Sequence, residues 1–378
     1  MNLERPKLIP MRRLEKISIQ GFKSIQEQTL ELGKLNVFIG GNGAGKSNLI
    51  QAFRFLREIV RGNLSTYSLE RGADSLLFLG RKYSPNMVLH VEFGDPDSLN
   101  AYRIHLKPTD EDSLIVSDET VYFQNRTRFS KPFNRVINSG SKEAVVGTSD
   151  DRVAKYVRRD LESYYVYHFH DTSDNAAAKQ PGPLQDNRVL RPDAGNLAAF
   201  LYALKETHLD HYRNIEGVIR QIAPFFDRFN LAPSQLNPEK IRLEWLEKGS
   251  DAYFNAMALS DGTLRFMCLA TLLLQPRLPA VVLIDEPELG LHPSAISLLA
   301  ELLRHAAEQT QVIVSTQSVT LVNQFSPAEV WTVERRDGAT VFEHLGKRDL
   351  GNWLEVYEGC EGFSLGELWE KNVIGGRP

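Results

Sequence analysis

Long hydrophobic runs and cysteines are both scarce in this sequence of 378 residues. The longest strongly apolar runs, such as residues 266–274, fall well short of the roughly 20 residues that a membrane-spanning helix needs, so we expect no membrane span and no membrane partner. Residues 1–10 hold no apolar stretch of the kind found in secretory signals, which favours a cytoplasmic protein. Cys268 and Cys360 lack C-x-x-C spacing, which disfavours metal or redox chemistry through cysteine.

A general excess of basic residues is also missing. Lysine and arginine number 44 against 48 aspartate and glutamate residues, for a formal charge of −4. The chain as a whole is therefore not a polybasic nucleic-acid binder, although a local patch can still serve that purpose. With 42% hydrophobic and 24% charged residues, the composition is that of a folded globular protein and excludes a disordered or fibrous chain. The length predicts two or three domains, or one large domain with insertions.

Short apolar segments alternate with helical patterns, which predicts a largely parallel α/β sheet. Buried strands are expected at residues 35–39, 280–285 and 312–315, with helices at residues 46–61 and 293–309. Three strand-like segments separated by turn residues predict an additional antiparallel layer at residues 87–93, 101–106 and 116–124. Two polar segments complete the pattern: residues 126–152 are expected to be an exposed loop, and residues 171–192 a linker.

Residues 40–47 (GGNGAGKS) fit the P-loop pattern G-x-x-x-x-G-K-[ST] between an expected strand and an expected helix. Glycines let the backbone curl so that its N–H groups point at phosphate oxygens, at a helix N-terminus that favours negative charge. The lysine charge then contacts the β- and γ-phosphates of ATP, and the serine hydroxyl coordinates Mg²⁺. The residues expected to bind the nucleotide here are Gly40, Asn42, Gly43, Gly45, Lys46, Ser47 and Asn48.

Residues 281–286 (VVLIDE) place two carboxylates after four apolar residues. A buried strand that delivers an aspartate at its carboxyl end is the Walker B arrangement. Asp285 is expected to hold Mg²⁺, and Glu286 to orient and deprotonate the attacking water. A strand that ends in an acidic turn is common on its own, so the interpretation depends on the P-loop upstream.

Residues 259–263 (LSDGT) precede an expected helix shortly before this strand. One interpretation is purely structural, because Ser260 or Asp261 can be an ordinary N-cap. The other is a second phosphate site, in which Ser260 and the Gly262 N–H act at a helix N-terminus. The sequence leaves both open at this point.

Four motifs together resemble the ABC-type ATPase heads of the RecF/SMC/OLD group: FIGGNGAGKSNLI, LSDGT, VVLIDEPELGLHP and VIVSTQS. The resemblance covers residues 12–60 and 255–335 well and the middle of the chain only in outline. It implies an α/β P-loop NTPase of the ABC-type head class, with a mostly parallel core sheet, an antiparallel β layer and a helical lobe. DEPELGLHP in particular resembles stand-alone RecF-like ATPases, many of which serve in DNA repair or anti-phage systems.

This resemblance implies roles for residues at matching positions. Ser260 and Gly262 would form the ABC signature, which contacts the γ-phosphate bound by the P-loop of a second subunit. Residues 289–291 would form the D-loop at the interface of a homodimer that assembles on ATP. Gln317 stands where such ATPases usually carry a switch histidine, and it cannot carry charge, so slow turnover is expected. The structural alternative is that Gln317 only caps the turn after its strand.

Two further positions are weaker candidates. Lys23, in the GFKS segment before the P-loop, would approach the nucleotide, and Gln124 is a candidate for the Q-loop glutamine. His168 and His170 flank Phe169 on one face of an expected strand, but without a third partner at suitable spacing a packed pair is favoured over a metal site.

The predicted organisation has two lobes. Lobe I comprises residues 1–193, with the P-loop and the antiparallel layer. Lobe II is helical, comprises residues 194–275 and presents the signature. Residues 276–345 return to lobe I, and residues 346–378 form a tail. The insert is too short for the long coiled coil of an SMC protein, and little chain follows residue 345 to form a nuclease. A nuclease or other effector encoded separately is therefore the expected protein partner.

Local basic clusters make DNA a candidate partner, bound without sequence selectivity because no base-reading motif is present. Most such clusters are only solvated faces. The candidates are Arg54, Arg57 and Arg61; Arg5, Lys7, Arg12, Arg13 and Lys16; and Arg126, Arg128, Lys131 and Arg135. The leading function is ATP binding and hydrolysis coupled to dimerisation. The alternatives are a nucleotide-dependent scaffold that hydrolyses little and, less favoured, a transporter ATPase subunit.

Overall fold

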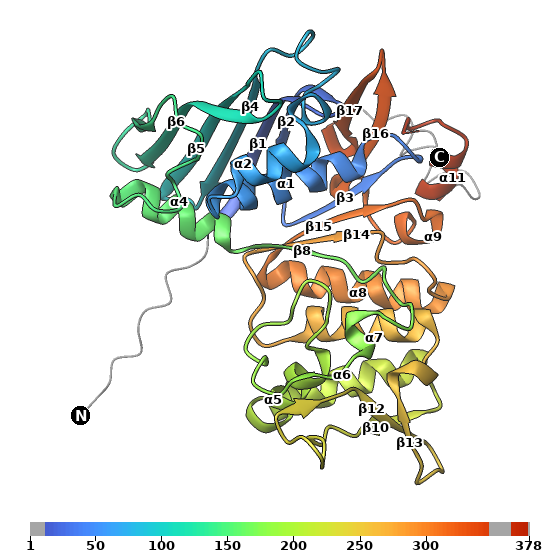
Figure 1. The fold of residues 1–378 in the computed structure, drawn as a ribbon. Helices are drawn as coiled ribbons and strands as arrows, with labels where there is room; N and C mark the ends of the chain where they lie inside the picture. The colour runs from blue at the N-terminus through green and yellow to red at the C-terminus, as the bar shows by residue number, and fades with distance from the viewer. Residues whose placement is uncertain (1–11, 348–363, 377–378) are drawn as a thin grey trace. The chain divides into compact units, whose positions relative to one another are not determined.

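The computed structural model describes residues 12–347 and 364–376, and Figure 1 shows their fold. The chain forms two units. Unit 1 consists of residues 1–32 and 51–164, and unit 2 of residues 33–50 and 165–378. Each unit is built around its own six-stranded sheet.

The sheet of unit 1 is antiparallel throughout. Side chains on β4 alternate between buried and half-buried, as expected of a sheet with one covered face. The predicted strands at residues 87–93, 101–106 and 116–124 are confirmed as β4, β5 and β6. In spatial order the strands are β2 (Ile25–Glu31), β1 (Arg13–Phe22), β4 (Met87–Gly94), β5 (Ser98–Pro108), β6 (Leu114–Asn125) and β7 (Phe133–Asn138).

The expectation of one exposed loop at residues 126–152 is wrong for its central part. Residues 133–138 form β7, which pairs with β6 at the edge of the sheet. The strand escaped detection because none of its side chains is buried, so no alternation of apolar and polar residues marks it. The helices associated with this unit are α1 (Lys46–Val60), which begins in unit 2, and α2 (Leu64–Arg71), α3 (Ala73–Leu76) and α4 (Arg152–Glu162).

The sheet of unit 2 has a parallel centre. β3, β15 and β14 are parallel neighbours, β16 pairs parallel to β3 on its other side, and β16 and β17 form an antiparallel hairpin. All five side chains of β3 are buried, which explains its uninterrupted apolar sequence. The predicted buried strands are confirmed as β3, β14 and β15. In spatial order the strands are β17 (Ala339–His344), β16 (Val330–Arg336), β3 (Leu35–Ile39), β15 (Gln311–Thr316), β14 (Val281–Asp285) and β8 (Tyr164–Tyr167).

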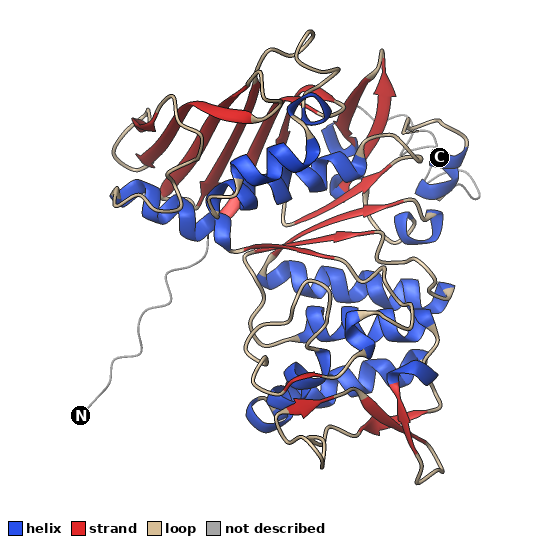
Figure 2. Ribbon diagram, in the orientation of Figure 1, coloured by secondary structure: helices blue, strands red, loops and turns tan. Residues whose placement is uncertain are grey.

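Helices of unit 2 pack against this sheet and against one another, as Figure 2 shows in blue beside the red strands. α8 contacts β15, and α7 packs on α8 with nearly every side chain buried. The helices are α5 (Leu197–Thr207), α6 (Leu209–Ile222), α7 (Asp261–Leu274), α8 (Pro293–Gln309), α9 (Val319–Val322) and α11 (Leu365–Glu370). The remaining strands of the unit are β9 (Gly182–Pro183), β10 (Phe226–Phe229), β11 (Lys240–Ile241), β12 (Glu244–Glu247) and β13 (Tyr253–Asn255).

Residues 171–192 are not a linker. Ala176, Ala178 and Leu190 are buried, the last two within the hydrophobic core of unit 2, and Gly182–Pro183 pairs with β11 as a short strand. Polar composition alone was misleading here, because a few small or apolar side chains suffice to fix a loop on a core. Among the described residues, no helix has the length and apolar character needed to cross a bilayer.

Candidate nucleotide-binding site

The P-loop joins β3 to α1, as the sequence predicts, and Lys46 is the first residue of the helix. The Lys46 ammonium group donates hydrogen bonds to the carbonyl oxygens of Gly40, at 2.5 Å, and Gly41, at 3.0 Å. Gly43 and Gly45 have φ angles of +77° and +110°, values that L side chains rarely adopt. The loop therefore folds around its own lysine in a conformation that requires glycine.

The β16–β17 hairpin packs against this loop. A Cβ atom on Gly40 would collide with the carbonyl oxygen of Val333, and one on Gly45 would collide with the side chain of Thr340. The Thr340 hydroxyl also donates to the Ala44 carbonyl at 2.9 Å. Sequence reasoning missed this support, because nothing in the local pattern of Thr340 indicates a contact with a loop almost three hundred residues earlier.

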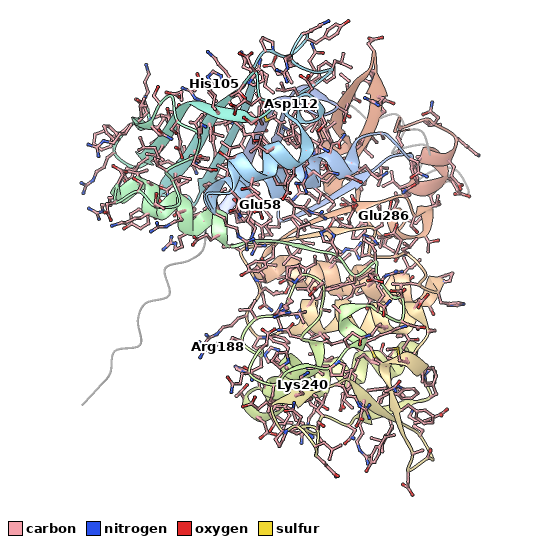
Figure 3. All side chains as sticks on the ribbon, viewed as in Figure 1. Glu58, His105, Asp112, Arg188, Lys240 and Glu286 are labelled. Carbon is pink, nitrogen blue, oxygen red and sulfur yellow. The ribbon has the colours of Figure 1, made fainter. Side chains whose placement is uncertain are left out.

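Asp285 and Glu286 lie at the carboxyl end of β14, and Figure 3 labels Glu286 there. The Glu286 N–H donates to the Ser315 carbonyl at 2.8 Å, which extends the pairing of β14 with β15 by one residue. Glu286 then turns out of the strand with a φ of +42°, an uncommon conformation for a residue with a side chain. The Ser315 hydroxyl donates to the Asp285 carboxylate. The Asp285 carboxylate therefore bonds to the neighbouring strand, whereas Glu286 leaves the strand conformation.

Gln317 contacts Glu286 directly. Its side-chain amide donates to the Glu286 carboxylate. The turn into α9 is capped by Ser318 instead, whose hydroxyl accepts from the Leu321 N–H at 3.2 Å. The side chain of Gln317 is therefore engaged with the acidic residue, and the interpretation of Gln317 as a cap is not needed.

Glu288 is a buried carboxyl group that sequence reasoning missed. It accepts hydrogen bonds from the Thr316 hydroxyl, at 2.5 Å, and from the Gln317 N–H, at 3.3 Å. Burial raises the pKa of Glu288, with a smaller contribution from the neighbouring charge of Glu286. Its Oε2 atom is buried and has no hydrogen-bond partner in the part of the chain described here. The sequence signal that could have identified Glu288 is its place as the second glutamate of DEPELGLHP. Through its two hydrogen bonds, Glu288 fixes the segment that carries Gln317.

The P-loop, Glu286 and Gln317 line one pocket of about 150 Å³. Burial lowers the pKa of Lys46, while the carboxylates of Glu286, Asp285 and Glu288 act in the opposite direction. Sequence-predicted residues that line the pocket are Asn42, Gly43, Gly45, Lys46, Ser47, Asn48, Glu286 and Gln317. Gly40 and Asp285 do not line the pocket themselves. The Gly40 carbonyl accepts a hydrogen bond from Lys46, and the Asp285 carboxylate accepts one from Ser315.

The donor set fits a nucleotide phosphate with a divalent cation. A glycine-rich loop that opens a helix presents N–H groups and the positive end of the helix dipole to phosphate. A Cβ atom on Gly43 would meet nothing within 4 Å, so the loop is open on the pocket side. Ser47 and Asp285 supply the oxygen ligands that Mg²⁺ prefers.

The segments predicted to form the signature and the D-loop are in contact at the start of α7. Ser260 is the N-cap of α7 and accepts from the Thr263 N–H at 3.3 Å, so the structural interpretation of Ser260 is correct, and it does not exclude a role with phosphate. A Cβ atom on Gly262 would collide with the carbonyl oxygen of Gly290, so the two backbones touch. The two predicted interface segments thus lie side by side in one chain.

Arg265 reinforces this contact and was missed by sequence reasoning. Its buried guanidinium donates to the carbonyl oxygens of Phe169, at 2.8 Å, His170, at 3.1 Å, and Leu289. One side chain of α7 therefore connects the predicted D-loop and the segment after β8 to this helix. Arginine suits this position because its planar fork carries several donors.

The remaining predicted candidates lie outside this pocket. Lys23 and Gln124 belong to unit 1, where the Gln124 amide donates to the Phe129 carbonyl at 2.8 Å. The rings of His168 and His170 stack with centroids 6.3 Å apart, as expected for a packed pair. Within residues 12–347 and 364–376, no group of three or more histidine, cysteine, aspartate or glutamate residues is arranged to hold a metal ion. Cys268 is a buried free cysteine, and Cys360 lies outside the described residues.

Comparisons with known proteins show the family and the fold of this chain. The profile of a family described as "AAA domain, putative AbiEii toxin, Type IV TA system" matches residues 35–323, more than half of the chain. No curated protein matches the sequence. An Smc head bound to the C-winged helix domain of ScpA is similar with a TM-score of 0.60 at 16% identity, over 89% of this chain and 99% of that chain. An Smc head domain with an extended coiled coil from Pyrococcus furiosus, bound to the C-terminal domain of ScpA, gives 0.58 at 15% identity, over 92% and 100%.

At these identities the structural matches concern the fold, and they confirm the predicted SMC/ABC-type head. The family match adds the AAA ATPase assignment over the span that contains the P-loop, Asp285, Glu286 and Gln317. This protein therefore belongs to that family of AAA domains and folds as an SMC-head-like P-loop ATPase.

Proposed function

We propose that this protein binds ATP with Mg²⁺, forms a homodimer when ATP is bound, and hydrolyses the ATP slowly. The observation that carries the proposal is the single pocket in which the P-loop faces Glu286 and Gln317. A phosphate-binding loop opposite a carboxylate that is hydrogen-bonded by a neighbouring amide is a suitable arrangement for positioning water against a phosphoryl group.

Binding would use the loop and its lysine. The Lys46 ammonium group and the loop N–H groups would contact the phosphates, with Gly40, Asn42, Gly43, Gly45 and Asn48 shaping the cradle. Ser47 and Asp285 would hold Mg²⁺, which when bound offsets negative charge on the β- and γ-phosphates. Because Lys46 already donates to two loop carbonyls, little reorganisation is needed to place its charge.

Hydrolysis would use Glu286 as the general base. Its carboxylate takes a proton from the attacking water as the new bond to the γ-phosphorus forms and the bond to the ADP oxygen breaks. The amide of Gln317 donates to this carboxylate and holds it in place. Gln317 cannot carry charge as a switch histidine can, which favours slow turnover.

Dimerisation would place the signature of one subunit against the nucleotide of the other. Ser260 and Gly262 would contact the γ-phosphate, and residues 289–291 would cross the interface. The lobe proposed at residues 194–275 is not helical throughout, because β10, β12 and β13 form a small sheet within it. The contacts among Gly262, Gly290 and Arg265 support this, because they hold both segments as one rigid surface. Such a dimer would act on DNA or control a separately encoded effector such as a nuclease, in DNA repair or anti-phage defence.

A second candidate is a scaffold that binds ATP and signals by its dimer state with little hydrolysis. The Gln317–Glu286 hydrogen bond favours it, since it occupies the carboxylate that hydrolysis needs. Phosphate release at saturating Mg-ATP separates the two candidates, with Lys46→Ala as the binding-deficient control. Turnover above the Lys46→Ala background that is lost in Glu286→Gln supports the ATPase. ATP binding with no turnover above that background supports the scaffold.

A further inference from the structure

The hairpin of β6 and β7 exposes three phenylalanine rings. Phe129 is 62% exposed, Phe133 is 60% exposed and Phe123 is 36% exposed. Phe123 and Phe133 are cross-strand partners, so their rings lie on the same face of the hairpin. Scattered exposed apolar residues are normal, but three rings gathered on one hairpin indicate a contact surface.

Cations alternate with these rings. Residues 126–136 (RTRFSKPFNRV) contain four basic residues and no acidic one, in a chain whose net charge is −4. Arg126 pairs with Glu15 and donates to the Asp95 carbonyl at 2.8 Å, so it anchors the base of the hairpin. Arg135 pairs with Asp151. In the described part of the chain, Arg128 and Lys131 form no ion pair, and their charges face solvent.

The turn that presents Phe129 is preorganised. The Phe129 N–H donates to the Asn125 carbonyl at 2.9 Å, and the Phe129 carbonyl accepts from the Gln124 amide at 2.8 Å. The Thr127 hydroxyl donates to the Asn125 side chain at 2.7 Å. Holding the ring's backbone before a ligand arrives lowers the entropy that binding would otherwise cost.

We propose that the β6–β7 hairpin binds single-stranded nucleic acid, with Phe129 and Phe133 stacking on bases and Arg128 and Lys131 contacting phosphates. Every base has a face on which an aromatic ring can stack, and interleaved cations match a flexible chain of phosphates. In a duplex those faces are covered by neighbouring bases, so the rings favour unpaired strands. The inference rests on the proposed function for its choice of nucleic acid as partner, and it adds the element, the strand state and the residues.

The stacking contribution is tested with a fluorescein-labelled 20-mer of thymidine, dT20, by anisotropy in the absence of ATP. The double variant Phe129→Ala/Phe133→Ala is expected to bind at least about tenfold more weakly, since stacking contributes roughly 1–3 kcal/mol per base. The double variant Phe129→Trp/Phe133→Trp is expected to keep binding, with tryptophan fluorescence quenched by the stacked bases. Tyr83→Ala, which removes a ring that is 74% exposed elsewhere in unit 1, is the matched control and should bind like wild type.

The phosphate contribution is tested by salt dependence. Arg128→Ala/Lys131→Ala should reduce the slope of log affinity against log salt by about 1.4, because each phosphate contact on a single strand adds about 0.7. The control Lys82→Ala/Lys107→Ala removes two exposed charges from the same unit and should leave the slope unchanged.

Three outcomes would overturn the inference. They are no binding of dT20 at low salt, binding of dT20 unaffected by Phe129→Ala/Phe133→Ala, and tighter binding of a duplex of the same length. If the phenylalanine variant instead abolishes self-association of the nucleotide-free protein and leaves dT20 binding intact, the hairpin is a protein interface. Lys46→Ala separates this test from the proposed function, because it should bind dT20 normally even though it cannot bind ATP.

Discussion

We expect the hydrogen bond between Gln317 and Glu286 to limit the rate of the proposed reaction, and replacing Gln317 with histidine tests this. Glutamine offers only a neutral donor, and here that donor is already hydrogen-bonded to the Glu286 side chain. A histidine can donate or share a proton as charge builds on the transferring phosphoryl group, and charge-assisted hydrogen bonds are roughly twice as strong as neutral ones. A gain of about 1.4–2.8 kcal/mol in the transition state corresponds to a ten- to hundredfold faster step.

The assay is steady-state phosphate release at saturating Mg-ATP, with nucleotide affinity measured separately. Gln317→His should raise turnover within that range and leave ATP affinity nearly unchanged, because the Lys46 and P-loop contacts remain. Gln309→His, at the exposed end of α8, makes the same chemical change away from the pocket and should do nothing. Wild-type turnover of tens per second, or a Gln317→Ala variant with an unaltered rate, would refute the reasoning.

Three other changes probe the surroundings of the pocket. Arg265→Met removes three hydrogen bonds worth about 0.5–1.5 kcal/mol each. It should weaken ATP-driven dimerisation, measured by sedimentation, while ATP affinity stays near wild type. Unchanged dimerisation would contradict the role of Arg265 in holding the predicted interface segments. Gly45→Ala should abolish ATP binding in an equilibrium assay, because the new methyl group meets Thr340 at a φ of +110°; retained affinity would count against the rigid loop. Burial raises the pKa of Glu288, so its protonation stabilises the folded state below an unfolded pKa of about 4.3, and that contribution is lost as pH rises through the raised pKa. Urea unfolding should therefore show that Glu288→Gln lowers the dependence of stability on pH between about 4.3 and the raised pKa, and an unchanged dependence in that range would contradict the assignment.

The elements that the sequence predicted well are those whose signal is local. A strand of five buried residues, a glycine-rich turn and a helix beginning at Lys46 follow one another within about twenty-five positions, and each has a recognisable pattern. Glu286 was found in the same way, because it follows a short apolar strand, whereas Gln317 was identified from the resemblance to ABC-type heads, at the position of their switch histidine. That their side chains touch is a consequence of β14 and β15 being parallel neighbours, so that residues just beyond the two strand ends meet.

The residues that were missed act through distant contacts. Thr340 supports a loop near residue 44, and Arg265 reaches carbonyls at residues 169, 170 and 289. Neither lies in a motif, and a threonine on a strand or an arginine on a helix is ordinary in sequence. β7 was missed for the opposite reason, since an edge strand exposed on both faces carries no alternation. Burial therefore made some elements predictable, while long-range hydrogen bonds and exposed edges needed the structure.

The most direct test of the proposed function is the oligomeric state of Glu286→Gln at saturating Mg-ATP, measured by light scattering. The substitution removes the base but keeps the P-loop, Ser260 and the D-loop, so ATP should bind, persist and hold two subunits together. The double variant Glu286→Gln/Lys46→Ala should stay monomeric, as should Glu286→Gln/Ser260→Arg, which blocks the signature. We predict a dimer for Glu286→Gln that is absent without ATP. A monomer at saturating ATP, or a dimer that forms equally well without nucleotide, would contradict the account.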